Sequence, residues 1–340
     1  QRLALLPPRD ACRWRRSAVI AQHEPGPVSL LAHVNGIVAG ATGVRPETVV
    51  LWRPSPTAAG AGVDDDDDSG AVATVSLAAK AAGAPRAVSA SVLCMLRSEI
   101  AVGCTDGAVR MLDVGSGAVA STWTKCHSTR VSCAVAAADG KLLTADDDGA
   151  AALWDVRAAP KSAVRFGGGA SAAAAATSAA AADSLVAVGD SAGAVRVWDV
   201  RRGDGPPLWA ASAAHADAIT ALTFGGRNLA SAGRDWAARV WRADKGGGGS
   251  SDDSPALAAH RGPVNALAWG PRAKTLVTAG ADAVVAEWKE AADAKGNSSR
   301  WELRRTVEAH TTGITAMAAA AVDGQPWALL TGAEDGSVCA

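Results

Sequence analysis

The stretch HADAITALTFGGRNLASAGRDWAARVW, residues 215–241, determines the architecture that we expect for this chain. Its apolar runs are separated by Gly-Gly at 225–226 and by Arg-Asp at 234–235, as tight hairpin turns require. We therefore expect short β-strands over 218–224, 228–232 and 237–241, with an outer strand near 207–212. A four-stranded sheet of this size cannot bury both of its faces alone, so several such sheets must stack against one another.

The same unit recurs along the chain. Its third strand ends at a Trp or, once, at a Leu, and these markers are Trp52, Leu112, Trp154, Trp198, Trp241 and Trp288. The intervals between successive markers are 60, 42, 44, 43 and 47 residues, and the long first interval indicates an insertion. A period of about 40–45 residues is typical of arrays of four-stranded sheets. A seventh marker would fall one position after the last residue, Ala340.

Three polar residue types stand at fixed places in the units. A His precedes the first strand, at His127, His215, His260 and His310. An Asp lies in a turn six residues before the Trp position, at Asp106, Asp148, Asp235, Asp282 and Asp335. A hydroxyl lies four residues before that Asp, at Thr144, Ser231, Thr278 and Thr331. Units two and four lack the His, and we expect them to be less rigid because fewer polar links hold their strands.

This ensemble resembles the WD40 repeat family over nearly the whole chain. The resemblance implies an all-β fold, a WD40-type β-propeller of seven four-stranded blades, in which His, Ser/Thr, Asp and Trp form a hydrogen-bonded tetrad. The implied structural tetrads are His127, Thr144, Asp148 and Trp154; His215, Ser231, Asp235 and Trp241; and His260, Thr278, Asp282 and Trp288. A buried His–Asp pair needs its polar atoms satisfied, so a structural tetrad explains this set better than a catalytic site does.

We expect residues 1–340 to form one propeller with three irregular segments. These are an N-terminal extension over 1–17, an acidic insertion loop over 54–86 that contains Asp64–Asp68, and a Gly/Ser/Asp-rich loop over 243–256. The N-terminal SAVIAQH resembles the outer strands RTVEAH and SPALAAH, so we expect it to complete the last blade. The chain begins with Gln and stops before its seventh marker, so we expect the native chain to extend at both ends. The Ala-rich run 167–182 is expected to form a poor strand with a loose or helical lead-in.

Composition excludes several classes of function. The net charge of −1 gives no general attraction to nucleic acid or to anionic membranes, and no apolar run reaches the length of a membrane span. The six cysteines form no CxxC pair and indicate reduced thiols in an intracellular protein, cytoplasmic or nuclear. Cys126, His127 and Cys133 could suggest a metal site, but the resemblance places His127 in a tetrad. We therefore expect no cofactor, no metal and no catalytic role.

The expected function is that of a non-catalytic scaffold that binds other proteins or peptides within an assembly. In this family the His-bearing loops and Asp-bearing turns emerge at one end, and the residues beside them are free to contact a partner: Arg130, Asp147, Asp217, Arg234, Trp236, Arg261 and Glu334. Trp236 stands out because a small or polar residue is usual after the turn Asp, and exposed Trp and Arg often anchor interfaces. The alternative is that Trp236 folds over the neighbouring blade.

Two weaker resemblances suggest narrower roles. Units three and four end in WDVR, with Asp155 and Arg157 in one and Asp199 and Arg201 in the other. Paired WDxR boxes are similar to those of substrate receptors of cullin-RING ubiquitin ligases, where the Arg contacts the adaptor. WDxR also suits a strand-ending turn with no such role. The run RWR at 13–15, followed by ATG and a blade ending in LW, resembles a nuclear-pore outer-ring propeller.

Overall fold

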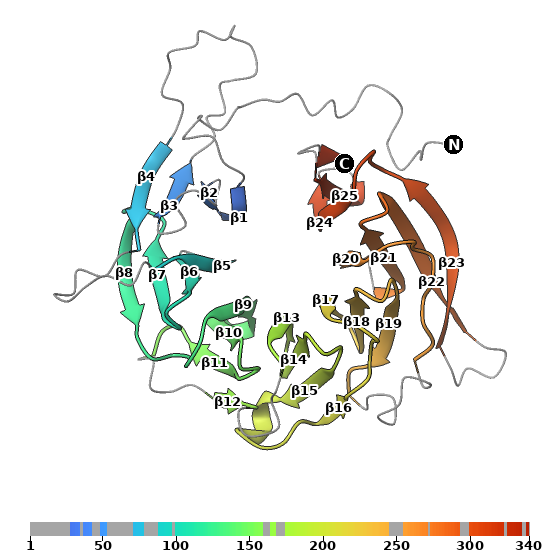
Figure 1. Cartoon of the computed structure of the whole chain (residues 1–340), viewed down its shortest axis with the longest axis horizontal. Helices are drawn as coiled ribbons and strands as arrows, with labels where there is room; N and C mark the ends of the chain where they lie inside the picture. The colour runs from blue at the N-terminus through green and yellow to red at the C-terminus, as the bar shows by residue number, and fades with distance from the viewer. Residues whose placement is uncertain are drawn as a thin grey trace, which may run out of the picture. The chain divides into compact units, whose positions relative to one another are not determined.

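The computed structural model describes residues 28–34, 37–42, 48–52, 71–77, 88–96, 99–158, 164–167, 174–244, 254–270, 273–292, 299–322, 325–334 and 338–339. Within these residues the strands form seven antiparallel sheets, of which five have four strands and two have three (Figure 1). The described strands divide into two compact units, an N-terminal unit that ends at residue 173 and a C-terminal unit that begins at residue 174. No helix in this part of the chain is both long enough and apolar enough to span a lipid bilayer.

The N-terminal unit contains three four-stranded sheets. The first consists of β1 (Val28–Val34), β2 (Ile37–Thr42), β3 (Thr48–Trp52) and β4 (Ala71–Ser76). The second consists of β5 (Ala90–Met95), β6 (Glu99–Cys104), β7 (Val109–Asp113) and β8 (Ala118–Trp123). The third consists of β9 (Val131–Ala137), β10 (Lys141–Asp146), β11 (Ala151–Asp155) and β12 (Val164–Phe166), with a 3₁₀ turn at Ala138–Gly140.

The C-terminal unit contains four sheets among the described residues. They are β13 (Ala176–Ala182), β14 (Leu185–Asp190), β15 (Val195–Asp199) and β16 (Trp209–Ala211); β17 (Ile219–Gly225), β18 (Asn228–Gly233) and β19 (Ala238–Arg242); β20 (Val264–Trp269), β21 (Thr275–Gly280), β22 (Val284–Ala292) and β23 (Ser299–Glu308); and β24 (Ile314–Val322), β25 (Gln325–Ala333) and β26 (Val338–Cys339). A 3₁₀ turn at Val200–Arg202 follows β15.

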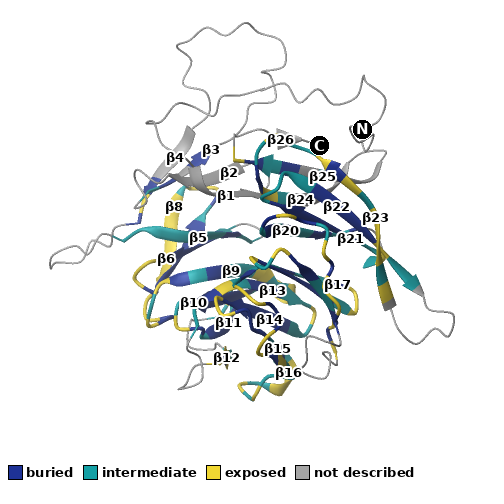
Figure 2. Ribbon diagram, turned by 45° about the vertical axis from the view of Figure 1, so that its right-hand side comes forward, coloured by how far each residue is buried: buried dark blue, intermediate teal, exposed yellow. Residues whose placement is uncertain are grey.

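In five of the sheets the second strand is almost completely buried (Figure 2). In β6, β10, β14, β18 and β21 every residue after the first is buried, because neighbouring strands and sheets cover both faces. Strands covered on both faces have continuous rather than alternating apolar sequences. This explains why NLASAG of β18 ends in the four small residues ASAG, since two layers pack against the strand.

Apolar clusters fill the space between successive sheets of each unit. In the N-terminal unit one cluster joins Leu51 to Ile100 and Leu112, and the next joins Met111 to Leu142 and Trp154. In the C-terminal unit, equivalent clusters centre on Trp241, on Trp288 with Leu276, and on Ile314 with Val277. Fully burying side chains of this size contributes about 1.5–3 kcal/mol each, so stacking of the sheets is the main source of stability.

Hydrogen bonds from the first strands link neighbouring sheets within each unit. The second residue of these strands is polar, and its side chain reaches the first residue of the next sheet. Ser91 Oγ donates to the Val131 carbonyl at 2.5 Å, Thr220 Oγ1 donates to that of Val264, and Asn265 Nδ2 donates to that of Ile314 at 2.8 Å. The sequence contained this signal as a small polar residue in second place of each first strand, but our sequence reasoning did not use it.

The strands of residues 207–242 lie within one or two residues of their predicted positions. The expected outer strand is β16, and it pairs with β15 of the preceding sheet. The Ala-rich run does form a strand, β13, along its described part. Its lead-in at 168–173 lies outside the described residues.

Two of the expected loops need correction. Strand β4 lies inside the 54–86 segment and pairs with β3, so that segment is not one continuous loop. Ser254, near the end of the 243–256 segment, is buried and its Oγ donates to the Val240 carbonyl at 2.8 Å. A bridge between Leu257 and Ala238 then places the following residues at the outer edge of β19, where a fourth strand would stand. The acidic run Asp64–Asp68, the extension 1–17 and the strand expected to complete the last blade lie outside the described residues.

Candidate functional site

The sheet of β17–β19 brings together all four residues of one expected tetrad. The Trp241 Nε1–H donates to Ser231 Oγ at 2.9 Å, and that hydroxyl lies 2.8 Å from Nε2 of His215. The Nδ1 of His215 lies 2.8 Å from Oδ1 of Asp235. An indole N–H can only donate, so the geometry fits a hydroxyl that donates to Nε2 and a neutral imidazole whose Nδ1–H donates to the carboxylate. This chain of bonds satisfies buried polar atoms that would be costly if unpaired.

The sheet of β20–β23 repeats this network. The Thr278 Oγ1 accepts the Trp288 Nε1–H at 3.1 Å and lies 2.7 Å from Nε2 of His260, whose Nδ1 lies 3.0 Å from Asp282. Burial would raise the pKa of Asp282, but hydrogen bonds from the Arg261 backbone N–H and from His260 outweigh burial and hold the pKa below its usual value. The carboxylate therefore stays charged and keeps the imidazole oriented.

In the sheet of β9–β12 the acid that contacts the His is Asp146, so the prediction of Asp148 was wrong. The Nδ1 of His127 lies 2.8 Å from Oδ2 of Asp146, and its Nε2 lies 2.7 Å from Oγ1 of Thr144. Thr144 Oγ1 also accepts the Trp154 Nε1–H at 2.8 Å. Asp146 is 1% exposed at the end of β10, whereas Asp148 is exposed in the turn and accepts a hydrogen bond from Ser128 Oγ at 2.9 Å.

The residue that ends the second strand of each sheet explains why Asp146, and not the turn residue Asp148, contacts the His in this sheet. Position 146 corresponds to Gly233 and Gly280 in the two other sheets. A Cβ at Gly233 would lie 2.7 Å from the His215 Nδ1 and 2.6 Å from the Asp235 Oδ1, and Gly280 is equally crowded by its own His and Asp. In these three sheets the network therefore holds either a strand-end carboxylate or a strand-end Gly with a turn carboxylate.

The last sheet shows part of the same network. His310 Nε2 lies 2.9 Å from Thr331 Oγ1, as the spacing predicted. Asp335, which would supply the acid, lies outside the described residues.

In the two repeats that lack the His, the sheets of β5–β8 and β13–β16, an arginine pairs with the acid instead. Arg110 of β7, which is 3% exposed, donates from both terminal nitrogens to Asp106 at 3.2 and 2.9 Å. Burial would raise the pKa of Asp106, but the bonds and charge of Arg110 outweigh it and lower the pKa. In the sheet of β13–β16, Arg196 lies 3.1 Å from buried Asp190. The sequence signal was an Arg four or six residues after the acid, which the search for His did not detect.

Four of the cysteines are buried within the described sheets. Cys94, Cys104, Cys126 and Cys133 are free thiols, and no group of three His, Cys, Asp or Glu side chains within the described ranges could hold an ion. Burial raises the pKa of each of these four thiols to about 11.

This burial predicts slow thiol chemistry in the folded protein. Because the thiolate is the reactive form, we expect the four described cysteines to react with iodoacetamide at pH 7.5 only as the protein opens. Peptide-resolved mass spectrometry of the labelled protein would measure this. Complete labelling of Cys126 within minutes under native conditions would contradict the expectation.

The loops that bear His and the turns that bear Asp lie at the same end of each sheet, and we call this end the turn face of each unit. On the turn face of the N-terminal unit, the sequence predicted that Arg130 and Asp147 would be free to contact a partner. The structure instead pairs them with each other. Arg130 donates from Nε and Nη2 to the Asp147 carboxylate at 2.9 and 3.1 Å, and both side chains are partly exposed. Their charges largely neutralise each other.

The turn face of the C-terminal unit carries the other expected contact residues, and all of them are exposed: Asp217, Arg234, Trp236, Arg261 and Glu334. Trp236 is 53% exposed, which does not fit a side chain folded over a neighbouring blade. Its backbone has φ +68°, whereas the same turn position is Gly107, Gly149 and Gly193 in three other sheets, with φ between +74° and +82°, and Ala283 with φ +63° in the sheet of β20–β23. A side chain at such a φ costs about 1–2 kcal/mol.

The two WDxR boxes form the same local structure. Asp155 Oδ1 accepts the Arg157 backbone N–H at 3.0 Å, and Asp199 Oδ1 accepts that of Arg201 at 3.0 Å. Each Arg also turns its guanidinium back onto its own Asp, at 3.3 Å for Arg157 and 2.7 Å for Arg201. Asp113 makes the same turn with Gly115 in place of Arg, so the Asp alone suffices to form the turn.

Comparison with known families identifies these repeats. The family model described as "WD domain, G-beta repeat" matches residues 119–155, 254–289 and 301–340. The chain is a WD40-repeat protein. The matched ranges include most of the sheets of β9–β12 and β20–β23 and the described strands of the last sheet. WD40 domains typically bind other proteins and are generally not catalytic.

Known proteins support this WD40 assignment. The chain is 28% identical over 165 residues to the DENN domain and WD repeat-containing protein SCD1 of Arabidopsis thaliana, a match that covers 48% of this chain and 13% of that protein. The chain thus spans only a small part of that relative. A chain of the mitotic checkpoint complex crystal structure has a TM-score of 0.62 at 20% identity, covering 92% of this chain and 88% of that one. The computationally designed Ika8 protein has a TM-score of 0.61 at 18% identity, covering 93% and 96%. These structures establish the WD40-type β-propeller fold class and nothing about partners.

Proposed function

We propose that this WD40 chain is a non-catalytic scaffold that binds protein partners through the turn face of its C-terminal unit. Trp236 carries the proposal. Its ring is half exposed although apolar, and its backbone holds a positive φ at a turn position where three other sheets have Gly and one has Ala283. Strained backbone often persists where function requires the residue, and Trp is frequent among interface anchors. An intracellular setting, cytoplasmic or nuclear, agrees with the free thiols of the described cysteines.

Replacing Trp236 by Gly separates a role in binding from a role in folding. Gly adopts φ +68° without strain, so we expect Trp236→Gly to leave the free energy of unfolding within about 1 kcal/mol of the parent, on the stabilised side. Loss of an anchor Trp costs about 2 kcal/mol or more in binding, so partner affinity should fall by about thirtyfold. Urea unfolding and quantitative co-purification from cells that express the chain would measure both effects.

Two results for Trp236→Gly would contradict the proposed role of Trp236 as a binding anchor. If stability falls by more than about 1 kcal/mol, the ring packs against the fold and is not a free anchor. If stability holds and every partner is retained, the turn face around Trp236 is not the binding surface.

A role as receptor for a cullin-RING ligase would require the WDxR arginines to contact an adaptor. Since each guanidinium is already paired with its own Asp, we expect the double variant Arg157→Ala, Arg201→Ala to capture the same proteins as the parent chain. Mass spectrometry of co-purified proteins tests this. Recovery of a cullin adaptor with the parent chain, and its loss with the double variant, would establish the receptor role instead. The RWR run that resembled a nuclear-pore propeller lies outside the described residues.

A further inference from the structure

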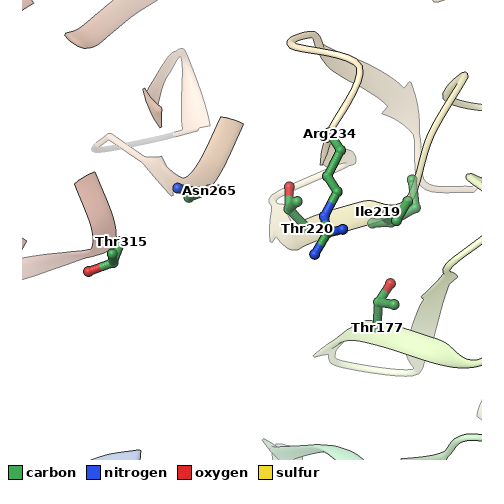
Figure 3. Close-up of a pocket in the computed structure, with 7 residues that line it drawn as sticks. Thr177, Ile219, Thr220, Arg234, Asn265 and Thr315 are labelled. Carbon is green, nitrogen blue, oxygen red and sulfur yellow. The ribbon is translucent and has the colours of Figure 1, made fainter. Parts of the chain in front are cut away.

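A hollow opens on the turn face of the C-terminal unit, where the first strands of its four sheets begin (Figure 3). The residues labelled there are Thr177, Ile219, Thr220, Arg234, Asn265 and Thr315. They come from β13, β17, β20, β24 and the turn after β18. The lining mixes polar side chains with Ala218 and Ile219, and Arg234 is its only charged residue.

The uncharged polar groups of this hollow already have partners in the fold. The Thr177 hydroxyl donates to the Gly189 carbonyl at 3.3 Å, that of Thr315 donates to Gly332 at 3.2 Å, and Asn265 donates to Ile314. Thr220 donates to Val264. These groups therefore shape the hollow and tie neighbouring sheets together, and they leave the guanidinium of Arg234 as the strongest free donor.

Arg234 itself is held at its backbone and free at its side chain. Its backbone N–H donates to the Ala218 carbonyl at 2.9 Å, which fixes the turn against the loop before β17. Among the described residues its guanidinium makes no ion pair and no side-chain hydrogen bond, and Figure 3 shows it directed toward Thr220 and the hollow.

The sheet of β9–β12 shows how a charge at this position can be neutralised within the fold. There the equivalent backbone bond joins Asp147 N–H to the Arg130 carbonyl at 3.1 Å, and the two side chains form a bidentate ion pair. In the sheet of β17–β19 the turn residue is Arg234, and the loop residue opposite it is Ala218, which cannot pair with it. The sheet of β9–β12 therefore has an ion pair at these two positions, whereas the sheet of β17–β19 has the cation Arg234 with no anionic partner among the described residues.

We propose that Arg234 binds a carboxylate side chain of an acidic protein segment, which replaces the intramolecular partner that Ala218 cannot supply. This inference rests on the proposed binding role of the turn face and adds the chemistry of the ligand. A guanidinium binds a carboxylate through two parallel hydrogen bonds. One free cation matches one negative charge, and the exposed carboxylate of Asp217, next to Ala218, disfavours a dianionic phosphate. Trp236, two residues further along the same turn, provides an apolar contact for the flanking residue.

Selection from a phage-displayed library of random dodecapeptides tests this proposal with the whole chain. We expect the selected peptides to be enriched in Asp or Glu beside an apolar residue. In fluorescence polarisation with the synthesised peptides, Arg234→Gln should weaken binding about tenfold or more, and the affinity of the parent chain should fall as salt rises. Arg227→Gln is the control, since Arg227 is also exposed but lies in the turn between β17 and β18, at the opposite end of that sheet.

A second pair of variants acts from the opposite loop. Ala218→Asp supplies Arg234 with an internal carboxylate, in the manner of Asp147 with Arg130, and should weaken acidic peptides as much as Arg234→Gln does. Ala218→Asn has nearly the same shape without the charge and should leave binding within about threefold of the parent. Both should unfold at nearly the same urea concentration as the parent, because Ala218 is only partly buried and lines the hollow.

Three results would overturn the inference. They are selected peptides without acidic enrichment, binding that survives Arg234→Gln, or tighter binding when phosphoserine replaces the selected Glu. The proposed function fails separately, because it requires that Trp236→Gly weaken the selected peptides whatever their charge. If the binding of the selected peptides depends on Trp236 but not on Arg234, the turn face is the binding surface but its ligand is not recognised through a carboxylate.

Discussion

Asp146→Ala is expected to lower the free energy of unfolding by about 3 kcal/mol, whereas Asp148→Ala should cost less than about 1 kcal/mol. The buried carboxylate of Asp146 accepts from His127 and from the backbone N–H groups of Asp148 and Ala150 at 3.1 and 2.9 Å. Its removal leaves the buried His127 donor without a partner and also takes the acceptor from the two part-buried backbone N–H groups. Asp148 loses only an exposed bond from Ser128.

Urea unfolding followed by tryptophan fluorescence compares the two variants directly. Asp146→Asn is the matched control, because an amide oxygen still accepts from His127, and we expect about half of the loss seen with Ala. A larger loss for Asp148→Ala than for Asp146→Ala would mean that the turn acid, as first expected from spacing, holds the network.

Gly233→Asp is expected to destabilise the fold by about 2–4 kcal/mol, and Asp235→Ala in the same chain should recover part of that loss. The single substitution puts a Cβ against His215 and Asp235 and brings two carboxylates together. Removing Asp235 leaves one strand-end carboxylate, which is the arrangement of Asp146 with His127.

A double-mutant cycle measures this exchange. The double variant should be more stable than the sum of the two single losses predicts, with a favourable coupling of about 1–2 kcal/mol. Gly280→Asp with Asp282→Ala in the next sheet offers an independent repeat. Additive losses at both sites would show that the acid cannot move between strand end and turn, and the explanation for Asp146 would fail.

Periodicity alone located most of the scaffold. The positions of His215, Ser231 and Trp241 followed from the repeat, because each is buried and has few acceptable replacements. The acid in the β9–β12 sheet did not follow, since three consecutive Asp at 146–148 satisfy a turn equally well and only burial distinguishes them. The pairing of Arg110 with Asp106 was also missed, because an ion pair across a turn leaves no fixed motif.

The turn face shows the other limit of sequence reasoning. Arg130, Asp147 and Arg234 looked alike as charges beside the repeated His and Asp positions, yet two of them pair with each other and the third has no described partner. That difference depends on the residue opposite each one across the loop. It became visible only when the loop and the turn were placed together.

The binding role of Trp236 is the central claim, and one measurement tests it most directly. Proteins co-purified with the parent chain, with Trp236→Gly and with the Arg157→Ala, Arg201→Ala variant would be quantified side by side at equal amounts of folded protein. We predict that a defined set of partners is lost with Trp236→Gly and kept with the arginine variant. Identical partner sets for the parent and Trp236→Gly would contradict the account.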